Sequence, residues 1–267
     1  MHSTLDFYRS TMRIAILTQF QYRVANYFWM IGMIAEPIIY MVVWSTVAVA
    51  QGGSVNGYTP GEFAAYYIVW TLVRNMNVVF TPYGWEWRIQ RGQLSGELLR
   101  PIHPIHGDVA FFAGWKVVVI ILWLPLAAIL SLIFKPTLSP TLLQVVVFSI
   151  SIWGAYLIRT MLLSLLGMIT FWTTRVGAIY ELFFAVELLV SGRLVPMPLM
   201  PEPVQRVAFF LPFQWTFYFP IEALVGDLPP QQLYIGLGMQ LLWILIGLAA
   251  VNLMWHFGIK RYSAVGN

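Results

Sequence analysis

The residues of this sequence that could do chemistry are charged side chains inside long apolar stretches. Glu36, Arg74, Arg159 and Glu187 each interrupt a run of mostly apolar residues. A charge near the centre of a bilayer costs about 2.5–3.5 kcal/mol on insertion scales, so each side chain must pair with another charge or face a water-filled cavity. The sequence leaves two interpretations open: structural ion pairs, such as Glu36 with Arg159, or residues that contact a transported substrate.

Motifs for other chemistry are absent. The chain has no cysteine, no H-E-x-x-H, no G-x-S-x-G and no lysine that follows a glycine, which excludes a Walker A loop. His103 and His106 are three residues apart, but Pro104 lies between them and no nearby carboxylate or thiol completes a four-ligand site. An intramembrane enzyme would need a cluster of His, Asp or Ser at one depth, and His256 lies at the end of its predicted span. We therefore expect no catalytic residue and no metal site on this chain.

The composition indicates an integral membrane protein. Hydrophobic residues make up 59% of the 267 positions and charged residues only 10%, against about 25% charged in soluble domains. The net charge of +4 comes from arginines and lysines scattered at the ends of apolar stretches. Membrane topology accounts for that distribution better than nucleic-acid binding does.

Hydropathy predicts an all-α protein with six transmembrane helices, since each crossing needs roughly 20 apolar residues. The transmembrane domain is expected to cover residues 27–256 and a short tail residues 257–267. The predicted spans are 27–50, 61–81, 107–134, 141–172, 177–195 and 232–256. The first stretch is too long for a signal-peptide core and is expected to be retained, although Ala48-Val49-Ala50 resembles a cleavage site.

An interfacial amphipathic helix is expected before the first span, within residues 1–26. Apolar residues recur there at steps of three and four, while Arg9 and Arg13 fall on another face. The recurring apolar positions are Leu5, Tyr8, Met12, Ile16 and Phe20.

The distribution of basic residues predicts the orientation. Nine Lys and Arg residues flank the predicted spans on one side and three on the other, Arg193 being counted among the three. The positive-inside rule then places both termini and the polar segment 84–106 in the cytoplasm. The nine are Arg9, Arg13, Arg23, Arg88, Arg91, Arg100, Arg175, Lys260 and Arg261.

Two segments between the spans have unusual patterns. In segment 84–106, charged residues alternate with Trp85, Trp87 and Ile89, which is typical of a short surface helix with one charged face. Segment 196–230 holds eight prolines and cannot form one continuous helix. Its apolar stretches favour partial re-entry into the outer face of the membrane, with an aromatic loop resting on the interface as the alternative.

These two segments resemble those of a known family. The pattern R-G-x-L-S-x-E-L-L-R-P-I at residues 91–102 is similar to the cytoplasmic loop between the second and third spans of ABC-2 type permeases. The match is closest to the bacterial branch encoded beside an ATPase and a second permease. The stretch P-F-Q-W-T-F-Y-F-P-I-E-A-L-V-G at residues 212–226 resembles the re-entrant hairpin before the last span of such permeases.

The resemblance implies a permease subunit of an ATP-driven transporter, expected to be an exporter, in a prokaryotic inner membrane. ATP and Mg would bind a separate ATPase subunit, with no cofactor on this chain. A second permease, identical or paralogous, would complete the path through the bilayer. The coupling helix that docks on the ATPase would comprise Glu86, Arg88, Ile89 and Arg91, and the outer hairpin would include Pro212, Trp215 and Glu222.

A rival function is an ion-coupled secondary carrier or channel, with Glu36, Arg159 and Glu187 as a relay. That class often shows internal inverted repeats, and the sequence shows none.

Overall fold

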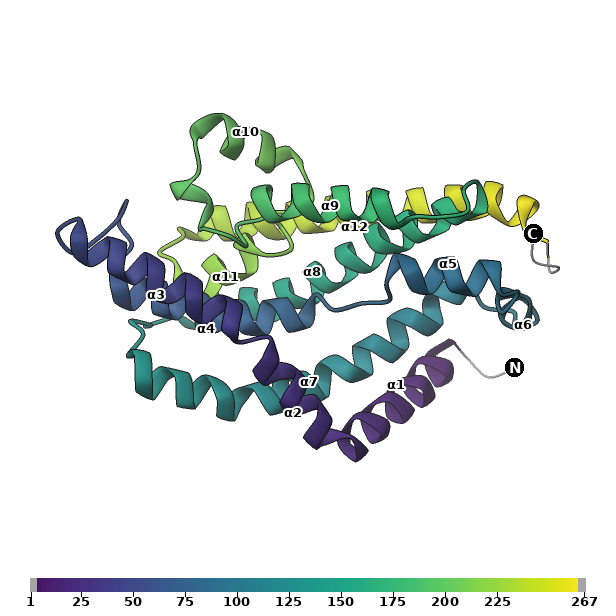
Figure 1. Cartoon of the computed structure of the whole chain (residues 1–267), viewed down its shortest axis with the longest axis horizontal. Coiled ribbons are helices and arrows are strands. Elements are labelled where there is room, and N and C mark those ends of the chain that lie inside the picture. The colour runs from purple at the N-terminus through teal and green to yellow at the C-terminus, as the bar shows by residue number, and fades with distance from the viewer. Residues whose placement is uncertain (1–3, 264–267) are drawn as a thin grey trace.

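The computed structural model describes residues 4–263, and in this part of the chain the secondary structure is helical, without strands. The helices form one elongated bundle (Figure 1). They are α1 (Thr4–Gln21), α2 (Arg23–Gly32), α3 (Ala35–Ala50), α4 (Pro60–Met76), α5 (Pro82–Gln90), α6 (Leu94–Leu98), α7 (Pro104–Phe134), α8 (Leu142–Met168), α9 (Gly177–Val190), α10 (Glu202–Phe210), α11 (Tyr218–Val225) and α12 (Pro230–Gly258). Three 3-10 turns lie at Ile169–Phe171, Met197–Leu199 and Ile259–Arg261.

Four helical stretches within the described residues are long and apolar enough to cross a membrane: Arg23–Ala50, Pro104–Phe134, Leu142–Phe171 and Pro230–Arg261. They match the predicted first, third, fourth and sixth spans. The predicted second and fifth spans correspond to α4, with 17 residues, and α9, with 14. At 1.5 Å per residue these two are about 26 and 21 Å long, shorter than a bilayer core of about 30 Å.

Helix starts follow from local capping chemistry. Thr59 and Thr141 each form a capping box with the residue three positions later, Glu62 in α4 and Gln144 in α8. Thr81 caps α5, whose first residue is Pro82. The helix ends were harder to predict: α4 stops at Met76, where the expected span continued to residue 81.

The core is built around α4, whose side chains are almost all buried. Helices α3, α7, α8 and α11 pack against it. Large side chains on α4, among them Phe63, Tyr66 and Trp70, are fully enclosed. Although α4 is shorter than the four candidate spans, it is the helix whose side chains are most completely buried, so its packing against its neighbours determines its position.

The N-terminal helix α1 packs along α7. The two backbones approach closely at Gly114, where an added Cβ would lie 2.6 Å from the Met12 carbonyl oxygen. Of the predicted apolar face, Met12, Ile16 and Phe20 contact the apolar residues of α7, while Leu5 is 76% exposed. The amphipathic helix thus exists with its face turned mainly toward another helix.

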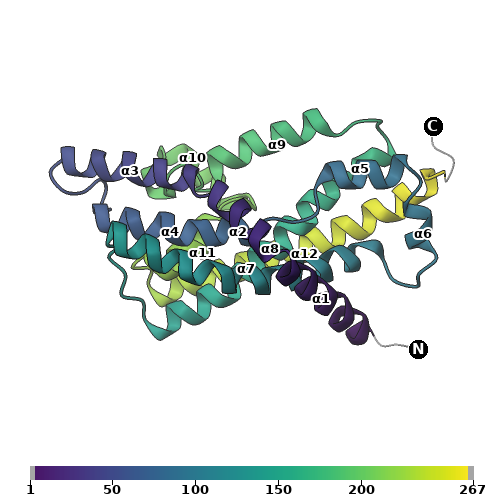
Figure 2. The same cartoon turned by 60° about the horizontal axis from the view of Figure 1, so that its bottom comes forward.

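The start of α1, the end of α12 and helices α5 and α6 lie at one end of the bundle (Figures 1 and 2). The loop after α3 and the loop between α7 and α8 lie at the opposite end (Figure 2). This arrangement puts the 84–106 segment on the same side as both ends of the described chain.

Candidate functional site

Glu36 lies near the middle of the first candidate span because that span is two helices. The break falls at Met33 and Ile34, between α2 and α3, so Glu36 is in the first turn of α3. Pro37 follows at a position whose N–H has no partner within the helix anyway. A carboxylate is also favoured at a helix N-terminus by the helix dipole.

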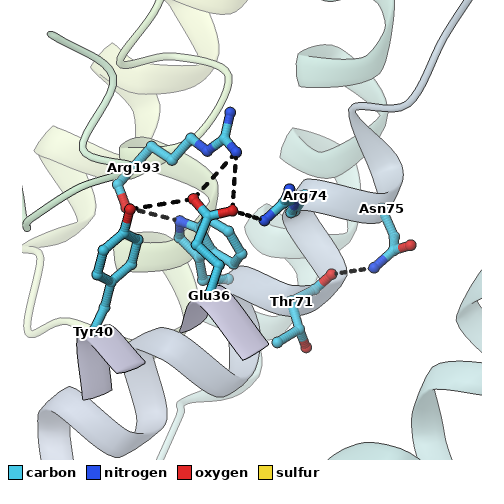
Figure 3. Close-up of polar contacts among 7 residues, drawn as sticks. Glu36, Tyr40, Thr71, Arg74, Asn75 and Arg193 are labelled. Carbon is cyan, nitrogen blue, oxygen red and sulfur yellow. Dashed lines mark hydrogen bonds and ion pairs between the residues drawn. The ribbon is translucent and has the colours of Figure 1, made fainter. Parts of the chain in front are cut away.

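Two arginines and one tyrosine surround the Glu36 carboxylate (Figure 3). Arg193 donates to both carboxylate oxygens at 3.2 Å, and Arg74 of α4 forms an ion pair with one of them. The Tyr40 hydroxyl donates to the other oxygen at 3.3 Å. The Glu36 and Arg74 side chains remain 29% and 21% exposed, so we call these four residues the open cluster.

The pairing of Glu36 with Arg159 suggested by the sequence is wrong. Arg159 of α8 pairs instead with Glu187 of α9, and both side chains are nearly inaccessible. Glu36 and Glu187 are therefore both in ion pairs. Glu36 pairs with Arg74 and Arg193, and Glu187 pairs with Arg159. Pairing at this depth removes the cost of an isolated charge.

Two further cations lie at this depth. Lys116, on α7, is fully buried and donates to the backbone carbonyls of Asn75, at 3.0 Å, and Val78. It caps the C-terminal end of α4, where a positive charge is favoured. The chain turns back after α9 at Gly192, whose φ of 80° favours glycine, and Arg193 follows directly and reaches Glu36.

Several buried polar atoms around these charges have no hydrogen-bond partner among the described residues. A buried polar group without a partner costs about 1–3 kcal/mol, so these atoms lower the stability of the layer. The atoms are Oδ1 of Asn75 and Asn77, Nε of Arg159 and Arg193, and Oε2 of Glu187.

A second charge cluster holds the 84–106 segment. Arg88 of α5 makes a two-pronged interaction with Asp108 at 2.8 and 3.0 Å, and its Nε lies 3.2 Å from Glu97. The guanidinium also sits over the rings of Phe80 and Trp85, at 4.2 and 4.8 Å. Arg88 is 8% exposed; we call Arg88, Glu97 and Asp108 the closed clamp.

The model of the ABC-2 family transporter proteins matches residues 10–266, almost the whole chain. The chain belongs to this family. It is therefore a membrane transport component, a multi-pass permease of the ABC-2 class. No curated protein matches the chain.

In this ABC-2 family member, the residues predicted to dock on an ATPase occupy different environments. Arg88 and Ile89 are buried against the chain itself, and the Glu86 carboxylate accepts the Val176 N–H at 3.0 Å. Arg91 is exposed at the end of α5, as is Trp87 at 53%. A docking role for the segment stays a prediction, and its exposed side chains are the ones available for it.

The residues predicted to form the outer hairpin of this permease are buried in the bundle or bonded within it. Pro212 is buried, and Trp215 donates to the Phe209 carbonyl at 3.1 Å. The Glu222 carboxylate accepts the Tyr58 hydroxyl at 2.8 Å, which ties α11 to the loop after α3. Segment 196–230 consists of short helices and turns that pack into the bundle, and its re-entry into the membrane stays a prediction.

The two histidines of the 84–106 segment both make hydrogen bonds within the chain. No group of three or more potential ligands is present in residues 4–263. His103 caps α7 by accepting the Ile105 N–H at 3.2 Å, and His106 bonds the Tyr8 hydroxyl at 2.7 Å. Burial, with a smaller effect from His106, lowers the pKa of His103 from 6.5 to about 4.

Proposed function

We propose that this chain is the transmembrane subunit of an ATP-driven exporter of the prokaryotic inner membrane. The open cluster is the observation that carries the proposal. Charged groups near the middle of a span cannot face lipid at acceptable cost, so the exposed side of Glu36 and Arg74 must face a water-filled path or another chain. A path between two copies of the chain, or between this chain and a paralogue, satisfies that requirement.

Six crossings follow if α4 and α9 complete their spans with the irregular segments that extend them. The residues after Met76 continue toward α5, and those after Val190 turn back into the bundle (Figure 1). Both termini and helices α5 and α6 would then face the cytoplasm, in agreement with the excess of basic residues on that side. The segment 196–230 would dip into the outer leaflet.

The coupling to a separate ATPase, which would hold ATP and Mg, is proposed to run through the tip of the 84–106 segment. Arg91 and Leu99 are exposed there, Leu99 at 87%. An exposed apolar side chain beside a positive charge suits a protein groove. The closed clamp behind this tip joins α5, the α6 region and the start of α7. These elements would therefore move together as a rigid unit when a docked ATPase displaces the tip.

Affinity purification of the tagged chain from its native membrane tests this proposal. We expect an ATPase subunit to co-purify with the wild type and the recovered ATPase activity to fall about tenfold in the double variant Arg91→Ala, Leu99→Ala, which corresponds to about 1.4 kcal/mol of docking energy. Arg206→Ala, in an exposed ion pair on α10, is the matched control and should leave recovery unchanged. Solute transport by the purified chain without any ATPase would overturn the proposal and favour the secondary carrier.

A further inference from the structure

The open cluster has the composition of an anion-binding site that is occupied by the protein's own carboxylate. One carboxylate, that of Glu36, receives donors from Arg74, Arg193 and Tyr40 (Figure 3). Guanidinium groups bind carboxylate and phosphate oxygens with the same fork geometry. The three donors would therefore suit a phosphate oxygen as well as they suit Glu36.

The charge balance favours an additional anion. Two guanidiniums share a single carboxylate in the open cluster, which leaves it with a net positive charge. Lys116 and Arg159 lie in the same layer, and only Arg159 has a carboxylate partner among the described residues. An excess of positive charge at this depth is costly unless an anion from outside the chain can reach it.

The arginines are positioned for a ligand. Arg193 is 6% exposed and packs on the rings of Phe184 and Trp70, at 4.8 and 5.8 Å, which fixes its orientation. Its buried Nε has no hydrogen-bond partner in the described chain. Arg74 lies 5.2 Å from the centroid of the same tryptophan ring and is partly exposed. One guanidinium is thus held rigidly, and the other can be reached.

Resting on the proposed permease function, we propose that Arg74, Arg193 and Tyr40 bind the phosphate group of the exported substrate, and that Glu36 is the internal counter-ion which this phosphate displaces. The substrate class is a phosphate-bearing compound, either a lipid with a phosphate headgroup or a soluble phosphate ester. A dianionic phosphate in place of Glu36 would balance the two guanidiniums. The Arg159–Glu187 pair, neutral and buried, has no such capacity.

The position of Glu36 allows this exchange. It follows the break between α2 and α3 by two residues, and Gly32 just before that break has open space around it. A small change at Met33 and Ile34 would withdraw the carboxylate while Arg74 and Arg193 stay on their own elements.

The test is phosphate binding by the purified full-length chain in a neutral detergent. Lysophosphatidic acid is titrated while the thermal unfolding midpoint is followed, with lysophosphatidylcholine as the zwitterionic lipid and glycerol phosphate as the soluble ester. The variants are Arg74→Gln and Glu36→Gln, and Arg206→Gln on α10 is the control.

We expect lysophosphatidic acid, and not lysophosphatidylcholine, to raise the midpoint of the wild type and the control. The half-saturating concentration should rise about tenfold in Arg74→Gln and fall several-fold in Glu36→Gln, because the competing carboxylate is gone. An equal response to glycerol phosphate would support the site and identify a soluble ester, and a response to the lipid alone would support it and identify a phospholipid.

Equal binding of both lipids, or weaker binding in both variants, would overturn the proposal. If Arg74→Gln does not fold, the Glu36→Gln arm decides, since a gain of affinity cannot result from lost structure. The assay needs no ATPase, so its failure is distinguishable from failure of the permease function, which is scored by co-purification.

Discussion

The closed clamp and the open cluster are mirror images in charge. In the clamp, one arginine lies between two carboxylates, Glu97 and Asp108. In the open cluster, one carboxylate lies between two arginines, Arg74 and Arg193. The clamp is at the end of the bundle, where water is near, yet its arginine is almost inaccessible. The cluster is near the middle of a span, yet it is partly exposed.

The exposures differ most between two of the arginines, since the Arg88 side chain is 9% exposed and that of Arg74 21%, whereas Glu97 and Glu36 are similar at 32% and 29%. A charge that could easily reach water but is buried and fully paired serves to fix α5, α6 and α7 relative to one another. A charge at membrane depth that remains accessible suits the binding of a group from outside the chain, as we propose for the open cluster. The difference between the two clusters can be measured through stability.

The largest effect is expected from Asp108→Ala. This change leaves the buried Arg88 guanidinium without its two-pronged partner, and breaking a buried pair costs about 3–5 kcal/mol. Glu36→Gln keeps an acceptor oxygen, and water can reach Arg74, so this change should cost less, about 1–3 kcal/mol, although Arg193 loses its carboxylate partner. Denaturant unfolding of both variants in mixed micelles measures the two free energies. Similar losses would mean that the two clusters do not differ in kind.

An effect of intermediate size on the free energy of unfolding is expected at the contact between α5 and α8. Gly167 of α8 faces Trp85, and an added Cβ would lie 2.4 Å from the Trp85 Cβ. Gly167→Ala should therefore lower the free energy of unfolding by about 1–3 kcal/mol through overpacking. Gly238→Ala on α12 is the matched control, because nothing lies within 4 Å of its added Cβ. In that control, helix propensity should leave stability unchanged or raise it by up to about 1 kcal/mol.

The same unfolding measurement, combined with the co-purification assay, sharpens the comparison. Gly167→Ala should also weaken recovery of the ATPase if α5 transmits the docking force. Equal stability of the two glycine variants would contradict a rigid α5–α8 contact.

The sequence predicted which residues matter at membrane depth better than how they pair. Glu36, Arg159 and Glu187 stand out because a charge in an apolar run is costly. Their partners depend on which helix faces meet, and Glu36 and Arg159 lie on helices whose charged faces do not meet. Hydropathy gives depth along a helix but no rotation about its axis.

The contacts of Lys116 and Arg193 were not predicted, because α4 and α9 were expected to end further along the sequence than they do. Lys116 is partnered by backbone carbonyls that are free only because α4 ends at Met76. Arg193 reaches Glu36 only because α9 ends at Val190 and the chain reverses at Gly192. Gly192, three residues before the predicted end of the fifth span at residue 195, was the available signal. The capped starts of α4 and α8, by contrast, follow from residues adjacent in sequence.

The smallest effect concerns pH and the closed clamp. His103 lines the same cavity of about 250 Å³ as Arg88, Glu97 and Asp108, and burial lowers its pKa from 6.5 to about 4. Between these values the unfolded chain binds a proton that the folded chain does not. The free energy of unfolding should therefore fall as the pH is lowered from 6.5 to 4, by about 1 kcal/mol once solvent screening of the partly buried ring is allowed for.

His103→Asn isolates this contribution, because asparagine can cap α7 in the same way but does not titrate. Burial raises the pKa of Glu97 in both proteins, so its effect cancels in the difference between them. We expect the wild type to lose stability relative to His103→Asn only below pH 6.5, in unfolding titrations at matched detergent. Parallel profiles would contradict a neutral, buried imidazole, and the clamp would then be more open to water than its arginine indicates.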